Sequence, residues 1–220
     1  MIEPKKIVRS KRKTLSLCVD RLGEVIVRAP FYTSEEKIYA FVAKKQGWLE
    51  KQMRKREQAG VRLPAKTLDG YSFLLLGESY RIQLYDGEII RMDNENKRLF
   101  LPKEKTEIRL VSWLKENASR IFTLQTERYA ALMGLRYQSV SISSAKTRWG
   151  TCSSDGKIRY TYRLLFAPRE VIDYVIVHEL AHLKYMNHGK GFWALVESYI
   201  PDYKKRRKWL KDRSALMEIF

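Results

Sequence analysis

One stretch decides the fold of this chain: PREVIDYVIVHELAHL, residues 168–183. Its apolar residues recur every three or four positions and Pro168 stands where a helix can begin, so the stretch predicts a largely buried α-helix. Near its end His178, Glu179 and His182 form the motif H-E-x-x-H. Four residues advance a helix by about 400°, so the two histidines project from one face and can bind a single metal ion.

Glu179 extends the prediction from metal binding to hydrolysis. It is offset from the two histidines on the helix, so it can reach a water molecule activated by the metal and act as general base. A buried glutamate and two buried histidines are costly in free energy unless a metal ion or hydrogen bonds satisfy them. The motif fixes only three positions, and the apolar helix around it strengthens the prediction.

The third predicted ligand is His188, the one remaining histidine of the chain. In a continuous helix it would lie on the wrong face and about 9 Å beyond the pair, so the helix must end first. Asn187 and Gly189 tolerate positive φ and would allow a sharp reversal. The spacing equals that of the metzincin class, although Tyr185 stands where that class has its turn glycine. Should His188 not bind the metal, Glu197 on the following helix is the alternative.

The chain is strongly basic. Its 43 Lys and Arg residues against 25 Asp and Glu give a formal net charge of +18 over 220 residues. Such a charge attracts polyanions without identifying them, so non-specific association with nucleic acid or nucleotides is one expectation and a solubilising surface is the other. The basic residues concentrate in three runs: Lys5–Lys13, Lys44–Arg56 and Lys204–Arg213.

The cysteines and the hydropathy narrow the class of protein. Cys18 and Cys152 lie far apart and match no paired metal-binding spacing, so neither a disulfide framework nor a cysteine zinc site is expected. No apolar run approaches the roughly 18 residues that span a bilayer, and the first residues lack the apolar stretch of a signal peptide. We therefore expect a cytoplasmic protein that does not bind membranes.

The N-terminal half predicts a β-rich subdomain over residues 1–103. Alternation over Thr14–Ala29 predicts a β-hairpin, and an amphipathic helix follows from about Thr33 to Glu57. Four short strands between Tyr71 and Pro102, separated by turn residues, predict an antiparallel meander.

Residues 104–220 are predicted to form the catalytic subdomain. A second long helix is expected over Thr106–Met133, where Gly134 is a natural stop. Strands are expected over Ser139–Ser144 and Lys157–Phe166 before the helix that carries the histidines. The expected fold class is therefore α+β, with the active-site helix packed on a small sheet.

The C-terminal third resembles the YgjP-like family of metal-dependent hydrolases, which is related to the SprT and WLM metallopeptidases. The resemblance is dense over about Ser139–Leu210 and rests on TRWGTCSS (147–154), YRLL (162–165), IDYVIVHELAH (172–182), NHG (187–189), FW (192–193) and PDY (201–203). It implies a zincin-like catalytic domain with a metal ion on His178, His182 and His188. Thr151 and Gly189 stand where the family often has serine, and neither is a proposed ligand.

The predicted mechanism is that of a zinc-dependent hydrolase, most simply a metallopeptidase with Glu179 as general base. Three imidazoles would also accept Ni²⁺, Co²⁺ or Mn²⁺. The residues that we expect to bind substrate or stabilise an oxyanion are Arg148, Trp149, Arg163, Tyr185 and Tyr203. A strand near Arg148 and Trp149 would suit an extended peptide, whereas Phe192 and Trp193 are expected to be packing residues.

Two other functions compete with the peptidase. A nucleotide phosphohydrolase, similar to a nucleoside triphosphate pyrophosphatase, fits the positive charge, although the sequence has no Walker-type loop. A DNA-associated protease module would use the run Lys204–Arg213, although no zinc finger or helix-turn-helix is present. The substrates expected are thus a peptide or protein, or else a nucleotide.

Overall fold

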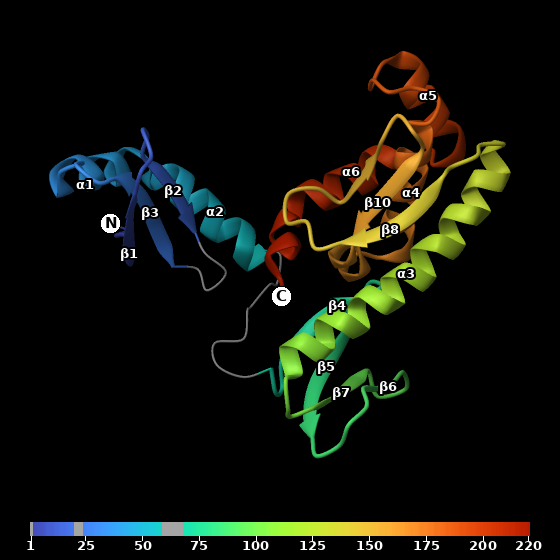
Figure 1. Cartoon of the computed structure of the whole chain (residues 1–220), viewed down its shortest axis with the longest axis horizontal. Helices are drawn as coiled ribbons and strands as arrows, with labels where there is room; N and C mark the ends of the chain where they lie inside the picture. The colour runs from blue at the N-terminus through green and yellow to red at the C-terminus, as the bar shows by residue number, and fades with distance from the viewer. Residues whose placement is uncertain (1, 20–23, 59–67) are drawn as a thin grey trace. The chain divides into compact units, whose positions relative to one another are not determined.

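The structure is a computed structural model that describes residues 2–19, 24–58 and 68–220. It is a mixed α+β protein with small sheets, and the chain divides into two compact units, Met1–Ala65 and Lys66–Glu218, the second of which includes Phe220 (Figure 1). Within the described ranges, no helix has the length and apolar character to cross a membrane.

The first unit is a three-stranded sheet with two helices: β1 (Lys6–Ser10), β2 (Ser16–Val19), β3 (Val25–Pro30), α1 (Glu35–Lys44) and α2 (Gln46–Gln58). Strands β2 and β3 pair antiparallel, as the predicted hairpin requires, and its turn lies outside the described residues. Strand β1 pairs parallel with β3, so the sheet is mixed and the prediction of a purely antiparallel subdomain was wrong. The buried core consists of Val25, Val27, Ala29, Ile38, Val42 and Leu49.

The predicted single helix of this unit is two helices. Ser34 caps the first, because its Oγ accepts a hydrogen bond from the backbone N–H of Lys37. Lys45 leaves the helical conformation, with φ of −108° and ψ of 11°, and α2 begins at the next residue. A break of one residue leaves the apolar periodicity almost unchanged, which is why the sequence pattern did not reveal it.

The second unit begins with a four-stranded sheet: β4 (Ser72–Leu75), β5 (Glu78–Tyr85), β6 (Arg91–Asp93) and β7 (Arg98–Pro102). Its order is β4-β5-β7-β6 and β5 runs parallel to β7, so the predicted antiparallel meander was wrong. Burial gives the reason. Leu99 and Leu101 of β7 are wholly buried and take the place beside β5, whereas β6 is mostly exposed and lies at the edge.

This sheet packs with the part of the chain that carries the histidines. The backbone N–H of Leu76 donates to the carbonyl of Leu165 at 2.7 Å, and the rings of Phe73 and Phe166 lie 6.1 Å apart. The sequence placed the subdomain boundary between residues 103 and 104, whereas the compact units divide between residues 65 and 66.

The helix α3 (Thr106–Met133) has the predicted bounds and ends at Gly134, whose φ of 63° is left-handed. It contacts a three-stranded sheet of β8 (Ser139–Ser143), β10 (Lys157–Thr161) and β9 (Gly150–Cys152), in the order β8-β10-β9. Strand β10 pairs parallel with β8 and antiparallel with β9, which leaves β9 at the edge. The predicted strand over Lys157–Phe166 ends at Thr161, and Tyr162–Phe166 form the 3-10 helix η1.

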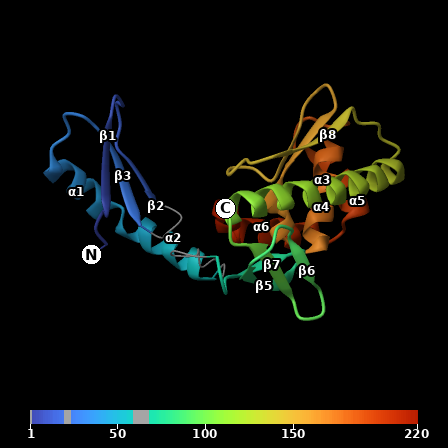
Figure 2. The same ribbon diagram turned by 60° about the horizontal axis from the view of Figure 1, so that its bottom comes forward.

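The chain ends with α4 (Arg169–Ala181), α5 (Lys190–Tyr199), α6 (Tyr203–Asp212) and the 3-10 helix η2 (Ser214–Glu218). The helix α4 is apolar almost all round, which suits its surroundings. It packs against α3, α5, α6 and β9 (Figures 1 and 2). This central helix carries the residues of the H-E-x-x-H motif.

Candidate metal centre

The histidines lie where α4 ends. His178 belongs to the last turns of the helix, and His182 is its C-cap residue. Beyond it the backbone N–H groups of Lys184 and Tyr185 both donate to the carbonyl of Ala181, which closes the helix in a tight turn. The chain then reverses into α5, although Gly189 has a φ of −78°, so the predicted use of positive φ around His188 was wrong.

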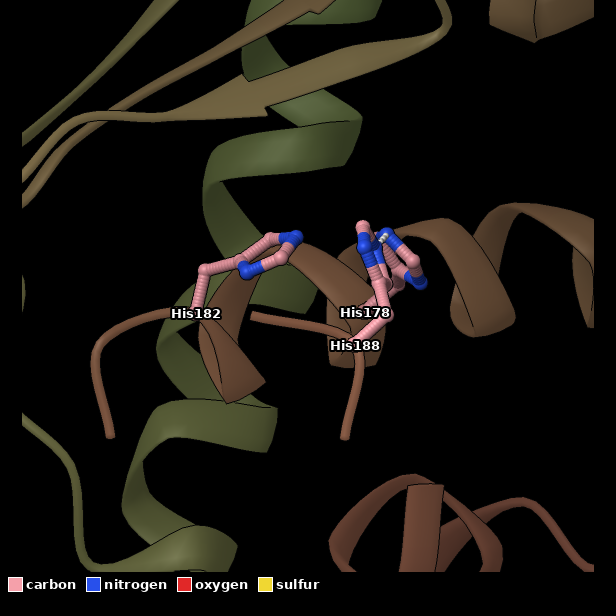
Figure 3. Close-up of side chains that lie close together, drawn as sticks. All are labelled: His178, His182 and His188. Carbon is pink, nitrogen blue, oxygen red and sulfur yellow. Dashed lines mark hydrogen bonds between the residues drawn. The ribbon is translucent and has the colours of Figure 1, made fainter. Parts of the chain in front are cut away.

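The reversal brings His188 back to the other two histidines (Figure 3). The potential ligand atoms of the three side chains all lie within 4.8 Å of one another. The Nε2 atoms of His178 and His188 are 3.1 Å apart, and the rings of His182 and His188 lie 4.8 Å apart. Within the described part of the chain, the group of side chains that could hold a metal ion contains these three histidines and not Glu197.

This donor set fits a divalent cation such as zinc. Zn–N bonds of about 2.0 Å in a tetrahedral site place ligand nitrogens about 3.3 Å apart, close to the separation of the two Nε2 atoms. Two imidazole lone pairs at that distance repel one another unless a proton or a cation lies between them. Three imidazole ligands would leave a fourth coordination position open, as catalytic zinc sites do.

The ring of His182 is oriented by the backbone of Tyr185. Its Nδ1 lies 3.1 Å from the carbonyl oxygen of Tyr185, which can only accept a hydrogen bond. The proton must therefore be on Nδ1, which leaves Nε2 free to bind a metal. Tyr185, predicted as a substrate-binding side chain, thus acts on the site through its main chain, while its own side chain is 36% exposed.

An aromatic cluster supports the three imidazoles from α5. The buried ring of Phe192 lies 4.9, 4.7 and 4.7 Å from the rings of His178, His182 and His188. Trp193 stacks on His188 at 5.6 Å and on Tyr203 at 5.0 Å. Tyr203, another predicted substrate-binding residue, is buried in this stack.

Desolvation favours the neutral, metal-binding form of His178 and of His188. The pKa of His178 is lowered to about 3, chiefly by desolvation and in addition by the charges of His182, His188 and Arg207. Desolvation likewise lowers the pKa of His188, with help from His182 and Arg207. The lone pairs of both rings are thus available at neutral pH.

Glu179 is buried beside the histidines. Its residue is 6% exposed, and desolvation raises the pKa of its carboxyl to about 8. The edge strand β9 approaches this carboxyl closely. A Cβ atom added to Gly150 would lie only 2.5 Å from Oε1 and 2.8 Å from Cδ of Glu179. Only glycine leaves room for Glu179, and this role of Gly150 was not predicted from the sequence.

Among the described residues, no strand pairs with the outer edge of β9, which lies next to Glu179. The carbonyl of Trp149 accepts from the N–H of Thr161, and the N–H of Ser153 donates to Lys157, so these residues face β10. In an antiparallel ladder the direction alternates, so the N–H and C=O groups of Gly150 and Cys152 point away from β10. This edge is the one that an extended peptide can join.

The remaining predicted substrate-binding residues lie in different surroundings. Arg148 is exposed and Trp149 is half-buried, both directly before β9. Arg163 is 2% exposed, and its guanidinium donates to the carbonyl of Ser144 at 3.0 Å and to that of Phe220. These bonds inside the core favour a structural role for Arg163.

A cation whose role was not predicted from the sequence lies near the site. The guanidinium carbon of Arg207, on α6, is 5.1 Å from the ring centroid of Trp193. Its charge contributes to the lowered pKa of His178 and of His188, as expected for a cation close to both rings. In the sequence Arg207 is one of many basic residues in its run, so nothing there distinguishes it.

Comparison with known proteins gives two matches. A model of the YgjP-like metallopeptidase domain family matches residues 13–213. The crystal structure of the metallopeptidase zymogen of Pyrococcus abyssi abylysin is 26% identical, over 41% of this chain and 92% of that chain, with a TM-score of 0.38. No curated protein matches this chain.

Proposed function

The chain belongs to the YgjP-like family of metallopeptidases, as its motifs predicted, and is a metal-dependent hydrolase; from this we propose that it is a zinc peptidase with Glu179 as general base. The observation that supports the proposal is the meeting of His178, His182 and His188 within 4.8 Å, beside a buried carboxyl group. In this proposal the three histidines hold the ion.

A bound zinc ion would supply Lewis acidity, which acidifies water and polarises a carbonyl group. The chain's own residues supply the proton transfers. Glu179 takes a proton from the attacking water and passes it to the leaving amine. Gly150 has no side chain, so it leaves the space on the strand side that the carboxyl of Glu179 occupies.

The edge strand β9 favours a peptide as the substrate. The backbone groups of Gly150 and Cys152 can pair with an extended chain, which would then lie beside Glu179. A nucleotide has no backbone to pair with this edge. The phosphohydrolase and the DNA-associated protease stay predictions from the sequence.

The test compares the wild type with Glu179→Gln and His188→Ala on casein, quenched peptides and a nucleotide panel, with metal content measured in parallel. Glu179→Gln should retain zinc and lose activity by at least about 10³-fold, because the base is lost and the ligands are not. His188→Ala should lose zinc. Reconstitution with Ni²⁺, Co²⁺ and Mn²⁺ identifies the best metal.

Two outcomes would refute this proposal. Peptide cleavage that survives both Glu179→Gln and chelation excludes the mechanism. Hydrolysis of nucleotides without hydrolysis of any peptide moves the protein to the phosphohydrolase class.

A further inference from the structure

The helix α6 carries a basic face close to the metal centre. Lys204, Arg207, Lys208 and Lys211 follow the spacing i, i+3, i+4, i+7, so they share one side of the helix, and all four are exposed. We call these four residues the α6 basic face.

Arg207 is the member of this face that reaches the site. It lies over Trp193, whose ring lies 5.6 Å from that of His188 and 5.9 Å from that of His178. One aromatic ring therefore separates the guanidinium from two of the histidines. The neighbouring Arg206 is different, since it pairs with Asp202 at 2.8 Å and donates to the carbonyl of Glu170.

A guanidinium in this place would repel a metal ion bound by the histidines, because only the ring of Trp193 lies between them. An anion that joins Arg207 would offset this repulsion. Among the residues that the structure describes, no carboxylate forms an ion pair with Arg207. The missing negative charge is one that a substrate can bring.

We propose that the α6 basic face recognises substrate and that Arg207 selects polypeptides with an acidic side chain close to the scissile bond. The proposal rests on the proposed peptidase function and names its substrate class. A guanidinium binds a carboxylate through two parallel hydrogen bonds, and the three lysines extend the attraction along an acidic segment.

The aromatic residues favour an acidic polypeptide over a nucleic acid. Single-stranded nucleic acids bind on exposed aromatic rings that accept bases. Trp193 is half-buried and stacked against both His188 and Tyr203, and Trp209 is half-buried beneath Arg213. Neither ring is available as a stacking platform, whereas the edge of β9 is suited to a peptide.

The experiment measures binding separately from cleavage. Two labelled peptides of one sequence, one with glutamates and one with glutamines beside the cleavage site, are titrated into zinc-loaded Glu179→Gln protein, with binding followed by fluorescence anisotropy. The acidic peptide should bind about tenfold more tightly, equivalent to about 1.4 kcal/mol. Adding Arg207→Gln should remove this preference and leave the affinity for the glutamine peptide unchanged.

Three further variants make the result specific. Arg207→Lys should retain most of the preference, and Arg207→Glu should reverse it toward a lysine-containing peptide. Lys37→Gln, which removes one exposed positive charge from α1, is the matched control and should change nothing. Zinc content should be equal in all variants, which shows that Arg207 is not needed to hold the metal.

The proposal is overturned if both peptides bind equally, if Arg207→Gln weakens both to the same extent, or if an oligonucleotide displaces the acidic peptide at lower concentration than unlabelled peptide does. If the Glu179→Gln protein prefers the acidic peptide while the wild type cleaves neither, recognition stands and the peptidase function fails. The two proposals are thus distinguishable.

Discussion

Glu179 and Gly150 form a contact in which one hydrogen atom takes the place of a side chain. The strand β9 approaches the carboxyl so closely that a methyl group at position 150 would overlap it. The carboxyl would have to rotate away, and a general base works only within hydrogen-bond reach of the proton that it removes.

Gly150→Ala should therefore lower kcat/KM on a peptide by about 10²-fold or more while zinc content stays at the wild-type level, since catalysis depends steeply on position. Activity and metal analysis measured on the same preparation test this. Gly47→Ala, at a position with open space around it, is the matched control. Full activity in Gly150→Ala would show that Glu179 does not have to lie where the structure places it.

At the scale of single residues, the sequence predicts those features of the site that depend on one helix only. The common face of His178 and His182 follows from helical periodicity alone. The contact of Gly150 with Glu179 and the place of Arg207 beside Trp193 depend on how β9 and α6 pack against α4, which no local pattern encodes.

At the scale of elements, the loop that carries His188 depends on α5. Trp193 stacks on His188 and Tyr203 stacks on Trp193, so one helix and the start of the next restrict the imidazole. Mutation of a residue that orients a metal ligand typically lowers metal affinity by about 10–100-fold.

Trp193→Ala should accordingly weaken zinc binding by about 10–100-fold, because His188 loses its stacking partner. Competition with a chromogenic chelator measures the affinity. Trp193→Phe retains a ring at the same place and should recover part of the loss. Equal zinc affinity in all three proteins would show that the loop orients His188 by itself.

The elements themselves were largely predictable and their partners were not. The bounds of α3 and the pairing of β2 with β3 follow from periodicity and from short-range turns. The parallel pairings of β1 with β3 and of β5 with β7 join segments that are not adjacent in sequence, and alternation says only that each is a strand.

At the scale of the whole molecule, the sheet of β4 to β7 belongs with the metal centre. A protein spanning residues 66–220 should fold cooperatively and bind zinc, because it keeps Leu76 bonded to Leu165 and Phe73 packed on Phe166. A protein spanning residues 104–220 should aggregate, because that apolar surface is exposed. Thermal unfolding and zinc retention compare the two. Native-like zinc binding by the shorter protein would support the boundary at residue 103 instead.

We expect the buried tyrosines to set the alkaline limit of the protein's folding stability. Desolvation raises the pKa of Tyr71 and of Tyr174 from an ordinary 10.0 to about 12, and raises that of the wholly buried Tyr160 further. Between pH 10.0 and about pH 12, these tyrosines lose their protons in the unfolded chain and keep them in the folded protein. Stability is therefore complete below about pH 10 and falls as pH rises toward 12.

Urea midpoints measured across that alkaline range test this expectation. Tyr160→Phe should flatten the fall, whereas Tyr39→Phe, at an exposed position, should leave it unchanged. Identical slopes in the wild type and Tyr160→Phe would exclude Tyr160 as a source of the pH dependence.

The position of His182 as the C-cap of α4 links the metal to the backbone of that helix. The C-terminal end of a helix carries about −0.5 of an elementary charge from its aligned peptide dipoles, and a cation bound there neutralises it. Because the unfolded chain has no such site, free zinc at about 100 times its dissociation constant would stabilise the fold by about 2.7 kcal/mol. The resistance of this protein to unfolding would then report the zinc supply of its surroundings.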